Sequence, residues 1–304
     1  PAWSPTGDRL VFSCSDPRKG SAIWSYDGKK SRVLAKGKYA DDISWRQDGK
    51  AFVYASSHVE DLYMVVDDVL MFDVDKKASR QLTDGKRARD PTISPDGTRI
   101  VAVTNELQDN QLAELTIDQR LLPMTEVNDG TQFSTPRFSP DGQRIAVSVH
   151  QGGLRDLWLY GADAKPLRRL TYDMAIDVQP AWSADGAWLY FASDRSGTFN
   201  VYAIEMATER LFRVTNAVTG AYAPSLRPDG KELAFLTYRT LGAGVATMPI
   251  DPANFKDLGF LPYGPSNEPG ASFVRSGEEP LPRAKADARA EAERGPEIVV
   301  GLGG

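Results

Sequence analysis

The sequence predicts an all-β fold: a six-bladed β-propeller of four-stranded antiparallel blades, followed by a mostly irregular C-terminal tail. Three observations predict it. A short phrase ending in Asp-Gly or Thr-Gly recurs six times, and its glycines are separated by 42, 48, 45, 44 and 44 residues. Each interval contains short apolar runs, most often four, without helical periodicity. A period near 44 residues with four strands per unit is typical of propeller blades.

The recurring phrase reads as the end of a short strand followed by a tight turn. One copy is Pro-Ala-Trp-Ser-Ala-Asp-Gly at 180–186. Glycine supplies the positive φ that such a turn requires, and Asp bonds back to nearby amides. Gln47 and Ala184 stand where the other copies have proline, and Thr6 stands where they have aspartate. Every copy keeps the glycine. We therefore assign the turn a structural role. The repeats that it marks start near residues 1, 43, 91, 136, 180 and 224.

The strands follow in the same order in each repeat. In the fifth repeat they are predicted at 179–183, 188–193, 200–205 and 211–215, because short runs rich in Val, Ile, Tyr and Phe between turn residues indicate strands. The second run is often continuously apolar, which indicates a strand covered on both faces. Residues 58–68 predict a lengthened hairpin in the second repeat.

The sixth repeat has no clear fourth run, and two segments are candidates for that strand: residues 255–260, or a segment ahead of Pro1. We assign residues 1–251 to the propeller and residues 252–304 to a tail or linker. The tail is rich in Pro and Gly and then, from 283 to 294, in Ala and charged residues. Because the sequence opens with proline inside a repeat, we expect it to be part of a longer chain.

Composition excludes several classes of function. The net charge is −5 and the pI is about 5.3, which argues against a nucleic-acid-binding surface. No run of about 18 apolar residues is present, so no transmembrane helix is predicted in this segment. Cys14 is the sole cysteine, which rules out an internal disulfide.

The repeats resemble a known family. The order of motifs in the fifth repeat is Pro-Ala-Trp-Ser-Ala-Asp-Gly (180–186), Phe-Ala-Ser-Asp-Arg-Ser-Gly (191–197), Val201-Tyr202 and Arg-Val-Thr (213–215). This order resembles the TolB-like β-propeller repeat, over roughly residues 1–251. The resemblance implies a propeller of the periplasm or cell envelope that binds another protein, such as an envelope lipoprotein, on one face of its channel. The Ala-rich tail departs from the family pattern.

No catalytic motif is predicted. The Gly-x-Ser-x-Gly elbow of serine hydrolases does not occur, and the two histidines, His58 and His150, lie about two repeats apart. We therefore predict a non-catalytic protein-binding module without a cofactor. The alternative is a gating propeller of a serine peptidase of the prolyl-oligopeptidase or tricorn type, whose catalytic domain lies outside this sequence.

Candidate binding residues lie in the loops that enter the first strand of each repeat, because these loops converge at the channel mouth of a propeller. Aromatic and arginine side chains supply most of the energy of protein recognition, whereas aspartates at strand entries also satisfy turn amides. A calcium ion at Asp41, Asp42, Asp90 and Asp177 is a lesser alternative. The predicted binding residues are Tyr39, Asp41, Asp42, Arg87, Arg89, Asp90, Phe133, Asp177, Gln179 and Tyr222.

Overall fold

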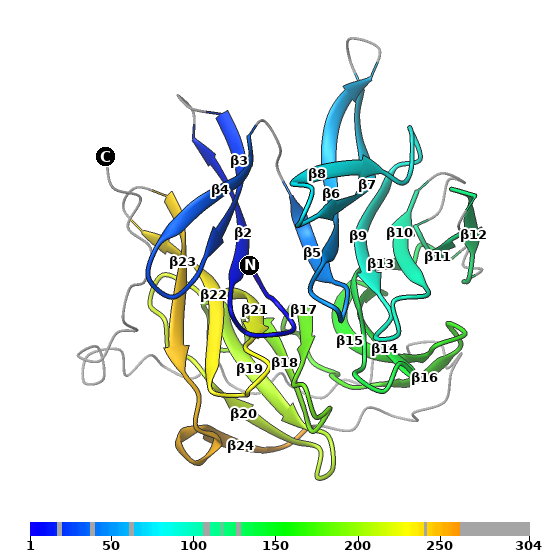
Figure 1. The fold of residues 1–304 in the computed structure, drawn as a ribbon. Helices are drawn as coiled ribbons and strands as arrows, with labels where there is room; N and C mark the ends of the chain where they lie inside the picture. Colours follow the sequence, from blue (N-terminus) through cyan, green and yellow to red (C-terminus); the bar gives the residue numbers. More distant parts are fainter. Residues whose placement is uncertain are drawn as a thin grey trace.

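Six antiparallel sheets surround a central axis, with the first strand of each sheet nearest the centre (Figure 1). This computed structural model describes residues 1–16, 20–36, 40–60, 64–105, 110–116, 118–125, 129–239 and 242–261. The first strands contact one another in a closed circle, from β1 through β5, β9, β13, β17 and β21 back to β1. The predicted six-bladed propeller is confirmed.

Each blade is numbered in chain order, and its strands pair as consecutive antiparallel neighbours. Blades 1 to 3 contain β1 (Ala2–Trp3), β2 (Leu10–Asp16), β3 (Gly20–Tyr26) and β4 (Ser31–Lys36); β5 (Asp41–Trp45), β6 (Ala51–Glu60), β7 (Met64–Asp73) and β8 (Ala78–Gln81); and β9 (Ala88–Ile93), β10 (Ile100–Thr104), β11 (Gln111–Leu115) and β12 (Leu121–Pro123). Blades 4 to 6 contain β13 (Gln132–Phe138), β14 (Arg144–Gln151), β15 (Leu154–Gly161) and β16 (Pro166–Arg169); β17 (Asp177–Trp182), β18 (Trp188–Ser193), β19 (Asn200–Glu205) and β20 (Arg210–Arg213); and β21 (Tyr222–Leu226), β22 (Glu232–Arg239) and β23 (Gly242–Pro249).

The recurrent turn joins the first and second strands of each blade. In blade 5, the Gly186 amide donates to the Ser183 carbonyl at 3.0 Å, and the Trp188 amide donates to the Ser183 hydroxyl at 2.9 Å. Gly186 has φ +69°, a region that favours glycine. A Cβ at this position would lie 3.7 Å from Cδ of Pro140, in the turn of the preceding blade. That distance is an ordinary van der Waals contact, so it is the positive φ of the turn that requires glycine here.

Buried apolar side chains fill the space between neighbouring blades. The described residues form six core clusters, each drawing its members chiefly from two adjacent blades. The cluster of Trp3, Leu10 and Phe12 with Ala234 and Val245 joins blade 1 to blade 6. Apolar burial at this sixth interface closes the ring. No helix in the described part of the chain is long and apolar enough to cross a membrane.

The candidate fourth strand of blade 6 at 255–260 was wrong. After a 3₁₀-helix (Pro252–Asn254), β24 (Lys256–Phe260) pairs with β20 and adds a fifth strand to blade 5 (Figure 1). Phe255 fixes one end of β24, with its ring 5.7 Å from that of Trp188. Leu261 fixes the other end in the core between blades 4 and 5. The start of the predicted irregular tail is therefore an ordered strand; residues 262–304 lie outside the described part.

Candidate functional site

A central channel runs between the first strands and forms a cavity of about 470 Å³. Side chains from all six blades line it. The end where the first strands begin is polar, with Asp41, Asp42, Arg137 and Gln179. The opposite end, where the recurrent turns lie, is lined mainly by proline and other uncharged turn residues: Pro5, Gln47, Pro95, Pro140, Ala184 and Pro228. We call the first end, together with the loops around it, the entrance face.

A ring of strained residues surrounds the channel near the entrance. Asp42, Asp90, Thr135, Gln179 and Ala223 occupy equivalent places in five blades, and all have positive φ, between 47° and 57°. Side chains in this ring bond to the next blade: Asp90 accepts from the Thr135 amide at 2.9 Å, and Gln179 accepts from the Ala223 amide at 2.8 Å. Non-glycine residues adopt this conformation when the surrounding structure enforces it. The ring therefore links neighbouring blades and fixes the polar groups at the entrance.

Two carboxyl groups and one guanidinium from three blades meet in this ring. Arg137 donates to Asp42 at 2.8 Å, and the side chain of Asp90 hydrogen-bonds to that of Asp42. Burial first, and then the negative charge of Asp42, raise the pKa of Asp90 to about 8. At pH 7 Asp90 is therefore mainly protonated and donates to Asp42. One carboxylate, one carboxylic acid and one guanidinium together carry no net charge.

This pairing predicts how stability depends on pH. The folded protein holds the Asp90 proton up to about pH 8, whereas the unfolded chain releases it near pH 4. The stabilisation by protonated Asp90 is therefore complete below about pH 4 and is lost as the pH rises through 8, by at most about 1.4 kcal/mol per pH unit for one proton. Asp90→Asn mimics the protonated acid, so its free energy of unfolding should fall less than that of the unmodified chain between pH 5 and 8. Parallel urea titrations at these pH values check this, and equal slopes contradict it.

Only some of the predicted binding residues lie on the entrance face. Asp41 is exposed in the channel, and Gln179 is in the ring. Arg87 is exposed, with Nη2 3.1 Å from Sδ of Met64 in the long hairpin β6–β7. The ring of Tyr222 lies between that of Phe199, at 4.9 Å, and that of the exposed Tyr238, which meets it edge to face at 5.6 Å. These side chains are available for contact with a ligand.

Other predicted residues are placed differently. Phe133 is 1% exposed and packs its ring against Tyr160 in the core between blades 3 and 4. A side chain in that position is unable to anchor a partner. Arg89 is half-buried, and its Nε has no hydrogen-bond partner within the described residues. Tyr39 lies outside the described part of the chain.

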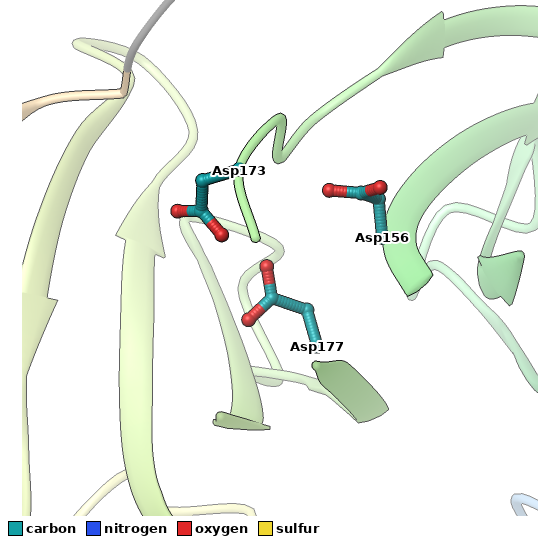
Figure 2. A group of neighbouring side chains, drawn as sticks. All are labelled: Asp156, Asp173 and Asp177. Carbon is teal, nitrogen blue, oxygen red and sulfur yellow. The ribbon is translucent and has the colours of Figure 1, made fainter. Parts of the chain in front are cut away.

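Asp177 belongs to a buried ion cluster rather than to the channel. Figure 2 shows Asp156, Asp173 and Asp177 turned toward one another. Arg195 donates to both oxygens of Asp177 at 2.8 Å and lies 3.3 Å from Asp173, while Arg169 bonds Asp156. The two guanidinium groups thus balance the charge of two of the three carboxyl groups. The structure does not bring Asp177 together with Asp41, Asp42 and Asp90, so the four predicted calcium ligands do not form one site.

Exposed apolar side chains gather on the entrance face. The entry loops and the hairpins between second and third strands share this face, because strands alternate in direction within a blade. Isolated exposed apolar residues are ordinary, whereas a concentration on one face indicates an interaction site. The other exposed large apolar residues lie on outer strands. Those of the entrance face are Val59, Met64, Val65, Met174, Ile176, Val218 and Tyr238.

Sequence reasoning missed Arg137. This residue stands between the proline and the aromatic residue of the recurrent phrase, where the other copies have Ala2, Ser44, Thr92, Ala181 and Ser225. One long charged side chain among small ones was the available signal. It is explained by the ion pair with Asp42 across the channel.

Comparison with known proteins gives consistent matches. Residues 125–275 match the model of the TolB beta propeller domain. The Tol-Pal system protein TolB of Francisella tularensis subsp. tularensis (strain WY96-3418) is 44% identical over 55 residues, which are 18% of this chain and 13% of that protein. The chain thus matches only a small part of this curated relative.

Solved structures share the fold. TolB from Acinetobacter baumannii superposes with a TM-score of 0.67 and 18% identity, over 81% of this chain and 62% of that one. The tricorn protease superposes with a TM-score of 0.61 and 16% identity, over 85% of this chain and 26% of that one. At these identities the superpositions show a common fold and no more.

Proposed function

Because the chain belongs to the TolB-like β-propeller family, we propose that it is a non-catalytic module that binds a protein or peptide on its entrance face. The observation that carries the proposal is the set of exposed apolar residues on the loops of that face. They surround a polar channel end where Asp41 is accessible. A mixture of apolar, aromatic and charged groups suits recognition of a protein surface.

The scaffold suits this role because it is rigid where the loops are attached. Each blade packs on its neighbours through a buried core, and the ring of Asp42, Asp90, Thr135, Gln179 and Ala223 connects successive blades at the entrance. Side chains held in place lose less conformational freedom on binding. The resemblance to the TolB-like repeat implies a place in the periplasm or cell envelope, and we extend the proposal to a partner there, such as an envelope lipoprotein; the match to a Tol-Pal system protein agrees with the resemblance. The likeness to the tricorn protease concerns the fold alone, so we do not extend peptidase gating to this chain.

A capture experiment with matched variants tests the proposal. Met174→Glu/Val218→Glu places charges at two exposed positions of the entrance face, and Leu258→Glu/Phe260→Glu makes the same change on the outer strand β24. Both should fold, because all four side chains are exposed. We expect the entrance variant to recover at least about tenfold less partner from a bacterial envelope extract, because each buried charge weakens an interface. The outer-strand variant should recover as much as the unmodified chain.

The quantity measured is the amount of each co-purified protein, by mass spectrometry, relative to the bait. Unfolding curves of the two variants serve as the control for folding. Equal recovery by both variants, or a loss confined to the outer-strand variant, would contradict binding at the entrance face.

A further inference from the structure

A threonine fixes the fourth strand to the third in four of the blades. The amide of one third-strand residue donates to the threonine hydroxyl at 2.8–3.0 Å, and the carbonyl of the same residue accepts from the apolar residue just before the threonine. We call this arrangement the threonine latch. The pairs of third-strand residue and threonine are Val69 and Thr83, Leu112 and Thr125, Leu157 and Thr171, and Val201 and Thr215.

Val245 holds the same position in blade 6. It pairs with Leu236, six residues after the turn glycine Gly230, just as Val201 pairs with Ala192, six residues after Gly186. The shared register turns the amide and carbonyl of Val245 toward the outer edge of β23. Within the described residues no strand pairs with that edge. Val245 itself is nevertheless buried, with 6% of its surface exposed. The third-strand half of a latch is therefore present without its threonine.

The chain's next strand does not fill this edge. β24, which follows β23, is held on blade 5 through Phe255 and Leu261. An unpaired edge presents amides and carbonyls that template the addition of another strand. Added strands obtain affinity from main-chain hydrogen bonds and specificity from side-chain contacts.

From this register we infer that the outer edge of β23 binds an extended segment of a partner polypeptide in which an apolar residue is followed by threonine. The segment pairs antiparallel to β23, its threonine hydroxyl accepts from the Val245 amide, and the apolar residue before it donates its amide to the Val245 carbonyl. The same order occurs in the four latched strands, as Leu82-Thr83, Met124-Thr125, Leu170-Thr171 and Val214-Thr215. This surface lies on the outside of the ring and is separate from the entrance face.

The residue before the third-strand partner differs between the blades. In blades 2, 4 and 5 the threonine hydroxyl also donates to Asp68, Asp156 or Asn200, one residue before the third-strand partner. Blade 6 has Gly244 at that position, which offers no side-chain acceptor. A latch at blade 6 therefore has one side-chain hydrogen bond fewer than those of blades 2, 4 and 5, and resembles that of blade 3, where Oε1 of Gln111 has no hydrogen-bond partner within the described residues.

A peptide-binding measurement with the full chain tests the inference. The probe is a fluorescent peptide with the sequence of residues 208–216, Thr-Glu-Arg-Leu-Phe-Arg-Val-Thr-Asn, from the fourth strand of blade 5. In the control peptide valine replaces the threonine that corresponds to Thr215, which keeps the shape and removes the hydroxyl. We expect the control peptide to bind about five- to tenfold more weakly by fluorescence anisotropy, the effect of one hydrogen bond.

Amide hydrogen exchange locates the bound peptide without altering the protein. The threonine peptide should slow exchange at Val245 and leave the amide of Val201, already latched in blade 5, unchanged. Three results would overturn the inference: equal affinity of the two peptides, exchange at Val245 that the peptide does not change, or protection of Val245 in the free chain, which would mean that another part of the same chain occupies the edge.

Discussion

Replacing Arg195 with methionine is expected to lower the free energy of unfolding by about 3–5 kcal/mol at pH 7, the usual cost of leaving a buried charge without its partner. Arg195 has a side chain 12% exposed, and Asp177, which it contacts through both carboxylate oxygens, is 0% exposed. The substitution also removes the ion pair between the Arg195 guanidinium and Asp173. Urea unfolding of the purified chain measures the difference.

Two further variants distinguish the effect of the unpaired buried charge from a general effect of replacing an arginine. Arg210→Met removes the arginine of a more exposed pair with Asp257 and should cost much less than Arg195→Met, because exposed ion pairs contribute little to stability. The double variant Arg195→Met/Asp177→Asn removes one orphaned carboxylate and should recover part of the loss. A cost below about 1 kcal/mol for Arg195→Met, or equal costs for the Arg195 and Arg210 variants, would contradict a structural role for the cluster in Figure 2.

The substitution Phe133→Ala is expected to cost about 3–5 kcal/mol, because it opens a cavity in a core that cannot fully collapse. The side chain lies against Tyr160, with ring centroids 5.8 Å apart, among the buried residues of blades 3 and 4. Phe133→Leu keeps most of the volume and should cost clearly less. Chemical unfolding of both variants checks the order.

The same variant separates packing from recognition. At a temperature where Phe133→Ala is still folded, its recovery of a partner should equal that of the unmodified chain, because the side chain does not reach the surface. A small loss of stability together with a large loss of partner would return Phe133 to the list of binding residues.

The fold could be predicted because the same sequence motif occurs six times along the chain. The spacing of the glycines and the order of apolar runs depend on local chemistry, and each copy confirms the others. The pairing of β24 was not predictable in this way. Its residues indicate a strand, but the choice of blade 5 over blade 6 depends on the contacts of Phe255 and Leu261 with distant residues.

The candidate site was predictable only at the level of which loops matter. Within one entry loop, neighbouring residues point to different surroundings, because the first strands of blades 2 to 6 shift their register near the ring residues of positive φ. Asp177 thus enters a buried cluster while Gln179, two residues later, lines the channel. The left-handed conformation of a glutamine or an aspartate has no distinct signature in a single sequence.

Site-specific photocrosslinking tests the central claim most directly. A photoreactive residue is placed at Val218, which is 82% exposed in the loop that enters β21 on the entrance face, and in a second chain at Asp229, an exposed residue of the turn at the opposite end of β21. After irradiation in an envelope extract, we expect a covalent adduct with one partner protein from position 218 and none from position 229. Adducts from position 229 alone, or equal yields from both positions, would contradict recognition at the entrance face.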